Sequence, residues 1–594
     1  MTDKSALSEK KLHADLCVVG GGIAGTFAAI TAARLGLKTV LIHERPVLGG
    51  NASSEIRMWI CGAQQRLYRE AGLQEELEIK NFYFNPTKNW YLFDSVLYDM
   101  AMSESNLTTL LNCTCFAADC ENQTIKSVTA YQMTTQTLID VSAEYFADCS
   151  GDSILAPLSG ANFMYGREAA KEYGEYVIRS HEVGDDKTMG NSVLIQARNV
   201  GHKVDFIAPE WAEKVSVEKL KSKDTDLKRP DENFWYIELG GCGDVIAESE
   251  TLNRRLLAIC LGAWDTIKNS GRFDADDYEL EFLGFLPAKR ESRRMKGDYV
   301  LTANDVLNGG KFEDTVAYGG WGLDDHNPDG FDGEESNYNQ PVGSVYGIPY
   351  RCLYSQNVSN LFFAGRNVSA THMATSSARV MGTCGCIGQA VGAAAFVARK
   401  YKATPRNAGE HIREIQQILL MNDCFLPNVN REVSALCREA ELSVIGKAEN
   451  VRRLCDGLDR NIESRDTGAL IANGSEVAYE FASPKEINGV KLVFDSDLLR
   501  ETVGAENECE RFHSTRSNVL PDSPVMRVPT TLAKAFVLSG ENERGETVTL
   551  YRTDRNLKRN LLIDVHGAYK RVGLTVIGNY GGAPETKVFT FEIF

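Results

Sequence analysis

The 594-residue chain is short of positive charge, since 64 Lys and Arg against 81 Asp and Glu give it a formal net charge of −17. Nucleic acids and anionic membrane surfaces are bound by groups of Lys and Arg, so we expect neither as a partner. A local pocket can still be basic on an acidic protein, which leaves an anionic substrate open. At this length we expect two or three domains.

Paired cysteine motifs are also missing. The 15 cysteines are scattered and odd in number, and their density is well below that of a secreted disulfide scaffold. They do not form the paired C-x-x-C pattern of a zinc site, so we predict no metal. We therefore expect mostly reduced thiols in a cytoplasmic protein.

A secretory signal and a membrane-spanning run are not expected either. Residues 1–15 mix charges of both signs, unlike a signal peptide. The uncharged run 16–33 contains three consecutive glycines near its start, and a membrane helix needs about 20 apolar residues. We therefore interpret this run as part of a soluble fold without a membrane partner.

The run fits a dinucleotide-binding strand–helix–strand unit. A short apolar strand leads into Gly20, Gly22 and Gly25, a small-residue helix follows, and a second strand ends at Glu44. Gly20 permits a tight turn, Gly22 lets the backbone approach a pyrophosphate, and Gly25 lets the helix pack closely on the strand. The amino terminus of the helix favours phosphates, and an acid at position 44 can accept hydrogen bonds from a ribose.

Further segments favour FAD over a nicotinamide cofactor. Gly49 and Gly50 follow the ribose acid, a strand runs into Gly151 and Asp152, and the strand "NLFFAG" precedes a loop and a small-residue helix. With "LPAKRESRRMKGDYV" and "YGGWGLDDHNPDG", these segments resemble the FAD-dependent oxidoreductase family, two-dinucleotide-binding flavoproteins distantly related to those of succinate dehydrogenase and fumarate reductase. The resemblance covers about residues 14–430 and implies FAD as cofactor. The residues that we predict to bind it are Gly20, Gly22, Gly25, Glu44, Arg45, Gly49, Gly50, Asn51, Gly151, Asp152, Gly365, Arg366, Gly388 and Gln389.

The predicted fold class is α/β, a Rossmann-like FAD-binding domain with an inserted α+β substrate domain, plus a carboxy-terminal β-sandwich of jelly-roll type. We place the FAD-binding domain at 12–160 and 341–405, the substrate domain at 161–340, a helical connection at 406–444 and the sandwich at 445–594. Short strands cut by Gly, Pro, Asn and Asp turns indicate the sandwich. It resembles galactose-binding-like domains, and both sugar binding and a purely structural role stay open.

Five side chains are candidates for chemistry. Arg57 could touch the flavin or substrate, or form a salt bridge with Glu55. Arg290 and Arg293 lie in a run of five basic residues that is either a solvated face or a clamp for a substrate hydroxyl or carboxylate. His326 follows two acids that could raise its pKa and orient an imidazole base. We expect His372 in the loop between the last flavin strand and its helix, beside the flavin ring.

We predict an FAD-dependent oxidoreductase that transfers a hydride between the flavin and a small polar substrate. Family context suggests a sugar or sugar acid. One alternative is a reductase of an unsaturated carboxylate, and another is a carbohydrate-binding protein with a structural flavin. The electron acceptor stays unknown, assembly into a homo-oligomer stays open, and without a second nucleotide fingerprint we do not expect NAD(P)H as a direct partner.

Overall fold

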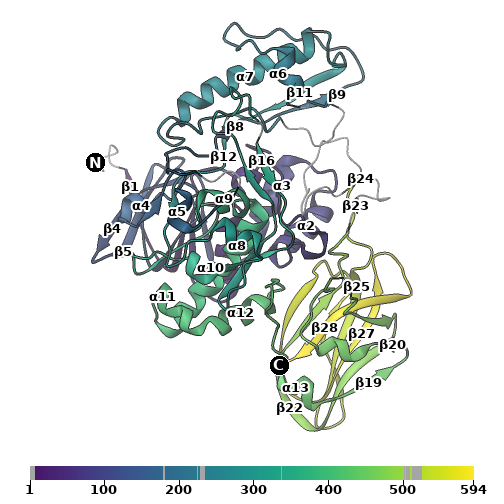
Figure 1. The fold of residues 1–594 in the computed structure, drawn as a ribbon. Coiled ribbons are helices and arrows are strands. Elements are labelled where there is room, and N and C mark those ends of the chain that lie inside the picture. The colour runs from purple at the N-terminus through teal and green to yellow at the C-terminus, as the bar shows by residue number, and fades with distance from the viewer. Residues whose placement is uncertain are drawn as a thin grey trace, which may run out of the picture. The chain divides into compact units, whose positions relative to one another are not determined.

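The structure is a computed structural model that describes residues 7–177, 181–223, 225–227, 234–335, 337–463, 465–500, 502–503, 509–510 and 525–594. Contacts between Cα atoms divide the chain into two compact units (Figure 1). The described parts of 1–64 and 88–412 form the first unit, and those of 65–87, 413–512 and 524–594 belong to the second. Each unit is described separately.

A seven-stranded sheet forms the centre of the first unit, with the order β3-β2-β1-β6-β5-β4 and with β18 also paired to β6. Its strands are β1 (Ser8–Val19), β2 (Thr39–Ile42), β3 (Leu107–Leu110), β4 (Cys113–Glu121), β5 (Thr124–Gln132), β6 (Thr137–Asp148) and β18 (Leu361–Phe363). The pairs β1–β2, β2–β3, β1–β6 and β6–β18 are parallel, and β4, β5 and β6 form an antiparallel meander. The predicted Rossmann-like sheet is confirmed.

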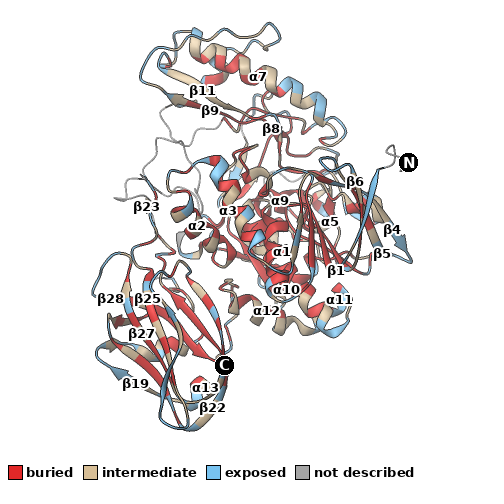
Figure 2. Cartoon of the chain, turned by 180° about the vertical axis from the view of Figure 1, so that it is seen from behind, coloured by how far each residue is buried: buried red, intermediate tan, exposed pale blue. Residues whose placement is uncertain are grey.

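Helices α1 (Ile23–Arg34) and α10 (Met381–Tyr401) pack against each other through small residues, and both are largely buried (Figure 2). A Cβ atom on Gly388 of α10 would lie 2.1 Å from the carbonyl oxygen of Ala24, so this contact requires glycine. By length and composition α10 could cross a membrane, but 83% of its most apolar window is buried inside the protein. It is therefore a core helix of this unit.

The remaining elements of the first unit either surround the sheet or belong to the inserted region, which is the part of the chain between β6 and β18. They are η1 (Gly50–Ala52), α3 (Trp90–Met102), α4 (Leu155–Ser159), β7 (Phe163–Met164), α5 (Ala170–Tyr173), β8 (Asn191–Ser192), β9 (Ile195–Asn199), α6 (Val217–Lys221), β10 (Glu238–Leu239), α7 (Ser249–Asn269), β11 (Tyr278–Leu283), β12 (Ala288–Lys289), β13 (Arg294–Met295), α8 (Ala303–Leu307), β14 (Thr315–Gly319), β15 (Leu323–Asp325), β16 (Tyr338–Gln340), β17 (Tyr346–Pro349), η3 (Tyr350–Cys352), α9 (His372–Ala378), α11 (Pro405–Ala408) and η4 (Gly409–His411).

The inserted region has its own apolar core under the long helix α7. The helix is amphipathic, as its sequence predicts, and buries Leu256, Ile259 and Trp264 on one side. It ends just before Gly271, whose φ of 67° suits glycine at a helix terminus. The strands of this region are short and pair in small groups, β10-β8-β12 and β9-β11.

The second unit is an antiparallel β-structure around one apolar core. Its elements are η2 (Arg66–Tyr68), α2 (Leu73–Phe84), α12 (Ile412–Met421), which starts at the boundary between the units, α13 (Ala435–Glu439), β19 (Glu441–Ile445), β20 (Ala448–Glu449), η5 (Val451–Cys455), β21 (Ala469–Ala472), β22 (Glu476–Phe494), β23 (Thr502–Val503), β24 (Cys509–Glu510), β25 (Ala533–Glu541), β26 (Thr547–Thr553), β27 (Asn560–Asn579) and β28 (Glu585–Ile593). The long strands β22 and β27 pair along most of their length with two shifts of register. Alternate residues such as Phe536 and Leu538 of β25 enter the core. The predicted β-sandwich is confirmed.

Residues 65–87, which the sequence places within the first FAD-binding segment, group with this second unit. Helix α2 is held there by two acids. The guanidinium of Arg500 lies 2.9 Å from a carboxylate oxygen of Glu75 and 3.0 Å from one of Glu78, and all three side chains are buried. Buried ion pairs thus attach α2 to the loop that follows β22.

Candidate functional site

Four loops at one edge of the parallel sheet carry most of the residues that we predict to bind FAD. The loop after β1 contains Gly20 and Gly22 and leads into α1, whose first turn contains Gly25. The loops after β2, β6 and β18 contain Glu44 and Arg45, Gly151 and Asp152, and Gly365 and Arg366. Because these strands are parallel, their carboxyl ends lie at the same edge of the sheet, which is where α/β folds bind nucleotides. Sequence segments separated by more than 300 positions are thereby brought together.

The first loop has the geometry of a phosphate cradle. A Cβ atom on Gly20 would lie 2.4 Å from the carbonyl carbon of Cys149, and one on Gly25 would lie 1.8 Å from the carbonyl oxygen of Gly20. In contrast, a Cβ atom on Gly22 would meet no heavy atom within 4 Å. Gly22 is also the N-cap of α1, whose first turn has no acidic residue and no side-chain cap. The open space and the free helix terminus both suit a pyrophosphate.

The second loop places an accessible acid beside this cradle. Glu44 follows β2 and keeps 47% of its side chain exposed, with the guanidinium of Arg45 at 3.7 Å. Behind it, Nδ1 of His43 accepts a hydrogen bond from the backbone N–H of Gly21 (3.0 Å), and Nε2 lies 3.0 Å from the carbonyl oxygen of Val47. The imidazole therefore links the two loops, and Glu44 stays open to a ribose.

Asp152 connects the other two loops to the basic run. Its carboxylate accepts hydrogen bonds from Lys289 Nζ (2.6 Å), Arg366 Nη2 (2.7 Å) and Ser292 Oγ (2.8 Å). Burial alone would raise the pKa of Asp152, but the Arg366 and Lys289 cations outweigh it and lower the pKa. Asn51 joins the same cluster through a 3.1 Å hydrogen bond from its amide to the Lys289 carbonyl.

Several buried polar atoms near these loops have no hydrogen-bond partner among the described residues. They include Oδ1 of Asn367, just after β18, Oγ1 of Thr383, in the first turn of α10, and Nε of Arg379. Arg379 directly precedes Val380, the N-cap of α10. Because buried polar groups in folded proteins almost always have partners, these atoms fit contact with a polar bound group. Together with the space at Gly22, they show that the site suits FAD.

Two predicted FAD-binding residues lie within α10 itself. Gly388 faces the backbone of α1, as described above, so its missing side chain already serves helix packing. Gln389 is buried in the same helix. Contact of these two residues with FAD stays a prediction. In the glycine pair, Gly49 forms a parallel β-bridge with Gly22, and a Cβ atom on Gly50 would lie 3.1 Å from Cα of Gly22.

His326 is held between two carboxylates. Its Nδ1 lies 2.6 Å from Oε2 of Glu238, and its Nε2 lies 3.4 Å from Oδ2 of Asp324. Arg290 adds an ion pair to Glu238 at 3.2 Å, and Arg379 adds one to Asp324 at 3.4 Å. Burial lowers the pKa of His326, but Glu238 and Asp324 outweigh burial and raise it. We call these five residues the His326 network.

His372 has a parallel arrangement. Its Nδ1 lies 2.8 Å from Glu291 and its Nε2 lies 3.0 Å from Asp325. Burial lowers the pKa of His372, but the two carboxylates outweigh burial and raise it to about 10. The ring is therefore an imidazolium at neutral pH, and both its nitrogens donate to protein acids. Arg294, fully buried, adds an ion pair to Glu291 at 3.3 Å.

The two networks draw on neighbouring residues. Arg290 and Asp324 contact the first network, while Glu291 and Asp325, the next residues in sequence, contact the second. Successive side chains of extended backbone point to opposite sides, so two short segments supply both networks. His372 lies between β18 and α10, as the sequence predicts, but it is the first residue of the short helix α9, whose N-cap Thr371 accepts a hydrogen bond from the backbone N–H of Ala374. Its position beside the flavin ring stays a prediction.

The two arginines that we predict from the basic segment, Arg290 and Arg293, differ in burial. Arg290 is buried and donates to the carbonyl oxygens of Gly190 and Trp235 at 3.1 Å, so it does not lie on a solvated face. Arg293 is partly exposed and donates to the carbonyl oxygen of Asp152 at 3.3 Å. Their roles toward a substrate stay predictions.

Arg57 is buried against the inserted region. Its guanidinium carbon lies 4.1 Å from the ring centre of Phe282, and Nη1 lies 3.6 Å from Glu281. Glu55, the salt-bridge partner considered from the sequence, lies instead 3.9 Å from Arg45. Arg57 thus connects the loop after the glycine pair to β11.

Three of the six tryptophans meet at the start of α10. Trp59, Trp235 and Trp321 belong to one apolar cluster with Val380, the N-cap of that helix. The ring of Trp235 also makes an edge contact with His326, with ring centres 5.5 Å apart. Trp59 and Trp321 come from segments far from the one that holds Trp235 and Glu238, no motif joins the three segments, and the sequence interpretation missed these four residues.

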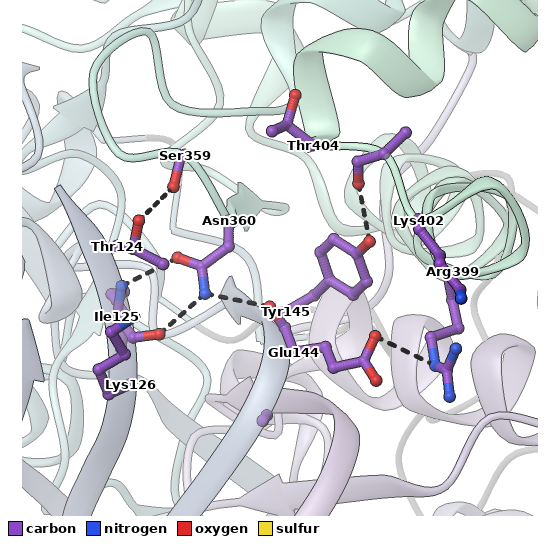
Figure 3. Close-up of a pocket in the computed structure, with 12 residues that line it drawn as sticks. Thr124, Ile125, Lys126, Glu144, Tyr145, Ser359, Asn360, Arg399, Lys402 and Thr404 are labelled. Atoms are coloured by element: carbon purple, nitrogen blue, oxygen red, sulfur yellow. Dashed lines mark hydrogen bonds and ion pairs between the residues drawn. The ribbon is translucent and has the colours of Figure 1, made fainter. Parts of the chain in front are cut away.

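A separate polar groove of about 520 Å³ lies elsewhere in the first unit (Figure 3). It is lined by β5, β6, the residues before β18 and the end of α10. Tyr145 donates to the carbonyl oxygen of Ala403 at 2.7 Å, and Asn360 donates to that of Ile125 at 2.9 Å. Because it meets the amino end of β18 and the carboxyl end of α10, this groove is distinct from the glycine loops.

Within the described residues, no group of three or more His, Cys, Asp or Glu could hold a metal ion.

The fold and the site are those of a flavoprotein whose dinucleotide-binding domain is built from two separate segments of the chain. The model of the family FAD dependent oxidoreductase matches residues 15–419, so the chain belongs to this family, and it is an oxidoreductase that depends on FAD. A search of curated proteins finds no significant match.

Three solved structures show what the chain is similar to. The OxyS anhydrotetracycline hydroxylase of Streptomyces rimosus is 10% identical with a TM-score of 0.32, covering 69% of this chain and 70% of that one. The family 32 carbohydrate-binding module of EndoD from Streptococcus pneumoniae is 12% identical with a TM-score of 0.20, covering 27% and 99%. A chitosan-binding module of a Paenibacillus chitosanase/glucanase is 16% identical with a TM-score of 0.18, covering 27% and 97%.

Proposed function

We propose that this enzyme transfers a hydride between FAD and a small polar substrate of the sugar or sugar-acid type. The observation that carries the proposal is the meeting of Trp59, Trp235 and Trp321 with the His326 network at the start of α10. Sugars have apolar C–H faces and a rim of hydroxyl groups. Aromatic side chains suit the faces, and a few fixed polar groups suit the rim.

The chain's own residues supply binding and electrostatics. When bound, FAD supplies the two-electron acceptor. The loop from Gly20 to Gly22 and the start of α1 would hold the pyrophosphate, and Glu44 would hold the ribose. Asp152 fixes the adjoining loops through Arg366 and Lys289. The amino terminus of α10 favours negative charge nearby.

The charge of the His326 network depends on the protonation of its histidine, whose pKa is raised because Glu238 and Asp324 outweigh burial. With His326 protonated, the three cations His326, Arg290 and Arg379 face the two anions Glu238 and Asp324. A fixed excess of positive charge in a buried site stabilises negative charge that develops on a substrate oxygen. This suits an alcohol and carbonyl pair as substrate and product.

Anaerobic titration of the purified holoenzyme tests the proposal. Members of a panel of sugars and sugar acids should bleach the visible absorption of the flavin, and the Trp321→Ala variant should need higher concentrations. Lys126→Ala, in the groove of Figure 3, is the matched control and should behave as wild type. The proposal fails if no sugar bleaches the flavin while unsaturated carboxylates re-oxidise the reduced enzyme, which is the result expected of a reductase.

A further inference from the structure

One buried carboxylate oxygen beside the tryptophans has no hydrogen-bond partner among the described residues. It is Oε1 of Glu238, in β10. We propose that this oxygen accepts a hydrogen bond from a substrate hydroxyl, which makes Glu238 a specificity-determining residue for alcohols at this position. The inference rests on the proposed function, because it names the group that the same site recognises.

The two oxygens of Glu238 have different surroundings. Oε2 lies 2.6 Å from Nδ1 of His326 and 3.2 Å from Nη1 of Arg290. Oε1 has neither contact, although the residue is only 3% exposed. Burial alone would raise the pKa of Glu238, but Arg290 and His326 outweigh it and lower the pKa. The carboxylate is therefore ionised, and Oε1 can only accept hydrogen bonds.

An unsatisfied buried acceptor destabilises the protein until a donor reaches it, and the effect is larger for a charged group. A hydroxyl of the substrate is such a donor, whereas a substrate carboxylate would place two negative charges together. Among the hydrogen-bond acceptors of the His326 network, only this oxygen is left without a partner within the described residues, whereas Nε of Arg379, which is also unpartnered, is a donor. Asp324, the other acid on His326, leaves no buried oxygen without a partner. Glu238 is thus the member of the network with an unpartnered acceptor, which is the group that a hydroxyl donor needs.

The Glu238→Gln variant changes the hydrogen-bond character of this position. His326 and Arg290 both donate toward Oε2, so the amide oxygen of glutamine should stay on that side. The amide NH₂ then takes the place of Oε1 and presents a donor. A hydroxyl loses its bond to a charged acceptor, while a ketone, which can only accept, gains a donor.

The experiment compares binding of alcohols and ketones to FAD-loaded enzyme. Glycerol and myo-inositol are titrated against the reduced holoenzyme, and dihydroxyacetone and the monoketone of myo-inositol against the oxidised holoenzyme. Neither combination can react. Binding is followed through tryptophan fluorescence, since Trp235 contacts His326. Asp324→Asn is the matched control, because it removes one carboxylate charge from the same histidine without touching the orphan oxygen.

We expect Glu238→Gln to bind the polyols about 10- to 100-fold more weakly and the ketones more tightly, with FAD content unchanged. Asp324→Asn should change the affinities for polyols and for ketones by the same factor and in the same direction. The inference is overturned if Glu238→Gln also changes the affinities for polyols and ketones in the same direction, or if no polyol binds the wild-type holoenzyme. Polyols that bind through Glu238 but never bleach the flavin would overturn only the proposed hydride transfer. If sugars bleach the flavin but Glu238→Gln leaves the ratio of alcohol affinity to ketone affinity unchanged, only this inference is overturned.

Discussion

The two units both bury charged networks, and these networks differ in how completely they are satisfied. In the second unit Arg431, Lys491 and Arg559 face Asp423, Asp459 and Glu592. None of their buried polar atoms lacks a hydrogen-bond partner within the described part of the chain. In the first unit the His326 network leaves Oε1 of Glu238 and Nε of Arg379 without one. Both networks are deeply buried, so burial alone does not distinguish their roles.

For these two networks, we expect this difference to distinguish a structural network from a binding site. A fully paired set of buried charges fixes how segments pack, and removing one member leaves an uncompensated charge. An incompletely paired set destabilises the free protein and is completed when a ligand supplies the missing partners. We therefore expect the balanced network to support folding of the second unit, and the proposed function assigns the incomplete one to recognition in the first.

The largest expected effect is on the balanced network. Asp459→Ala removes the carboxylate shared by Lys491 (3.4 Å) and Arg431 (3.1 Å), and we expect the second unit to lose about 3–5 kcal/mol of stability. All six tryptophans lie in the first unit, so tryptophan fluorescence reports unfolding of that unit, and we expect this unfolding transition to be unchanged in the variant. Hydrogen exchange in β22 peptides, measured on the full chain, should accelerate. Unchanged exchange in β22 would show that the network does not support the fold.

The imidazolium of His372 makes the first unit sensitive to pH. Its pKa is raised from 6.5 to about 10 in the folded state by Glu291 and Asp325, against the opposing effect of burial. A raised folded-state pKa stabilises the fold fully below pH 6.5, and that stability is lost as the pH rises toward about 10. Urea denaturation followed by tryptophan fluorescence should show this decline. His372→Asn should flatten it, and an equally steep decline in that variant would assign the effect to other groups.

The sequence predicts the sheet and its phosphate-binding loop because both depend on local pattern. Apolar strands, the spacing of Gly20, Gly22 and Gly25, and the small-residue helices are visible in short windows. Glu238 and Trp235 carry no such pattern, since their importance depends on contacts with residues far away in the chain. The position of α2 in the second unit depends on Arg500, more than 400 residues later. Such pairings are set by tertiary packing and leave no periodic signal.

A smaller effect is expected where a paired acid organises the FAD loops. Asp152→Asn weakens the contacts to Lys289 and Arg366, so the loops are less preorganised, and we expect about 10-fold weaker FAD binding. Calorimetric titration of the apoprotein with FAD measures this. Asp185→Asn, which disrupts an Asp–Arg pair with Arg167 in the inserted region, is the control and should retain wild-type affinity. Equal losses in both variants would indicate a general effect on folding.

The smallest effect is expected at an exposed pair in the second unit. Lys485 lies 3.0 Å from Glu439, closer than Lys491 lies to Asp459, but the two side chains are 38% and 55% exposed. Water screens such a pair, and holding two long side chains in place costs entropy, so Lys485→Gln should change stability by less than about 1 kcal/mol. Hydrogen exchange in β22 peptides, compared directly with Asp459→Ala, tests this. If the two variants accelerate exchange equally, distance and not burial determines what these ion pairs contribute.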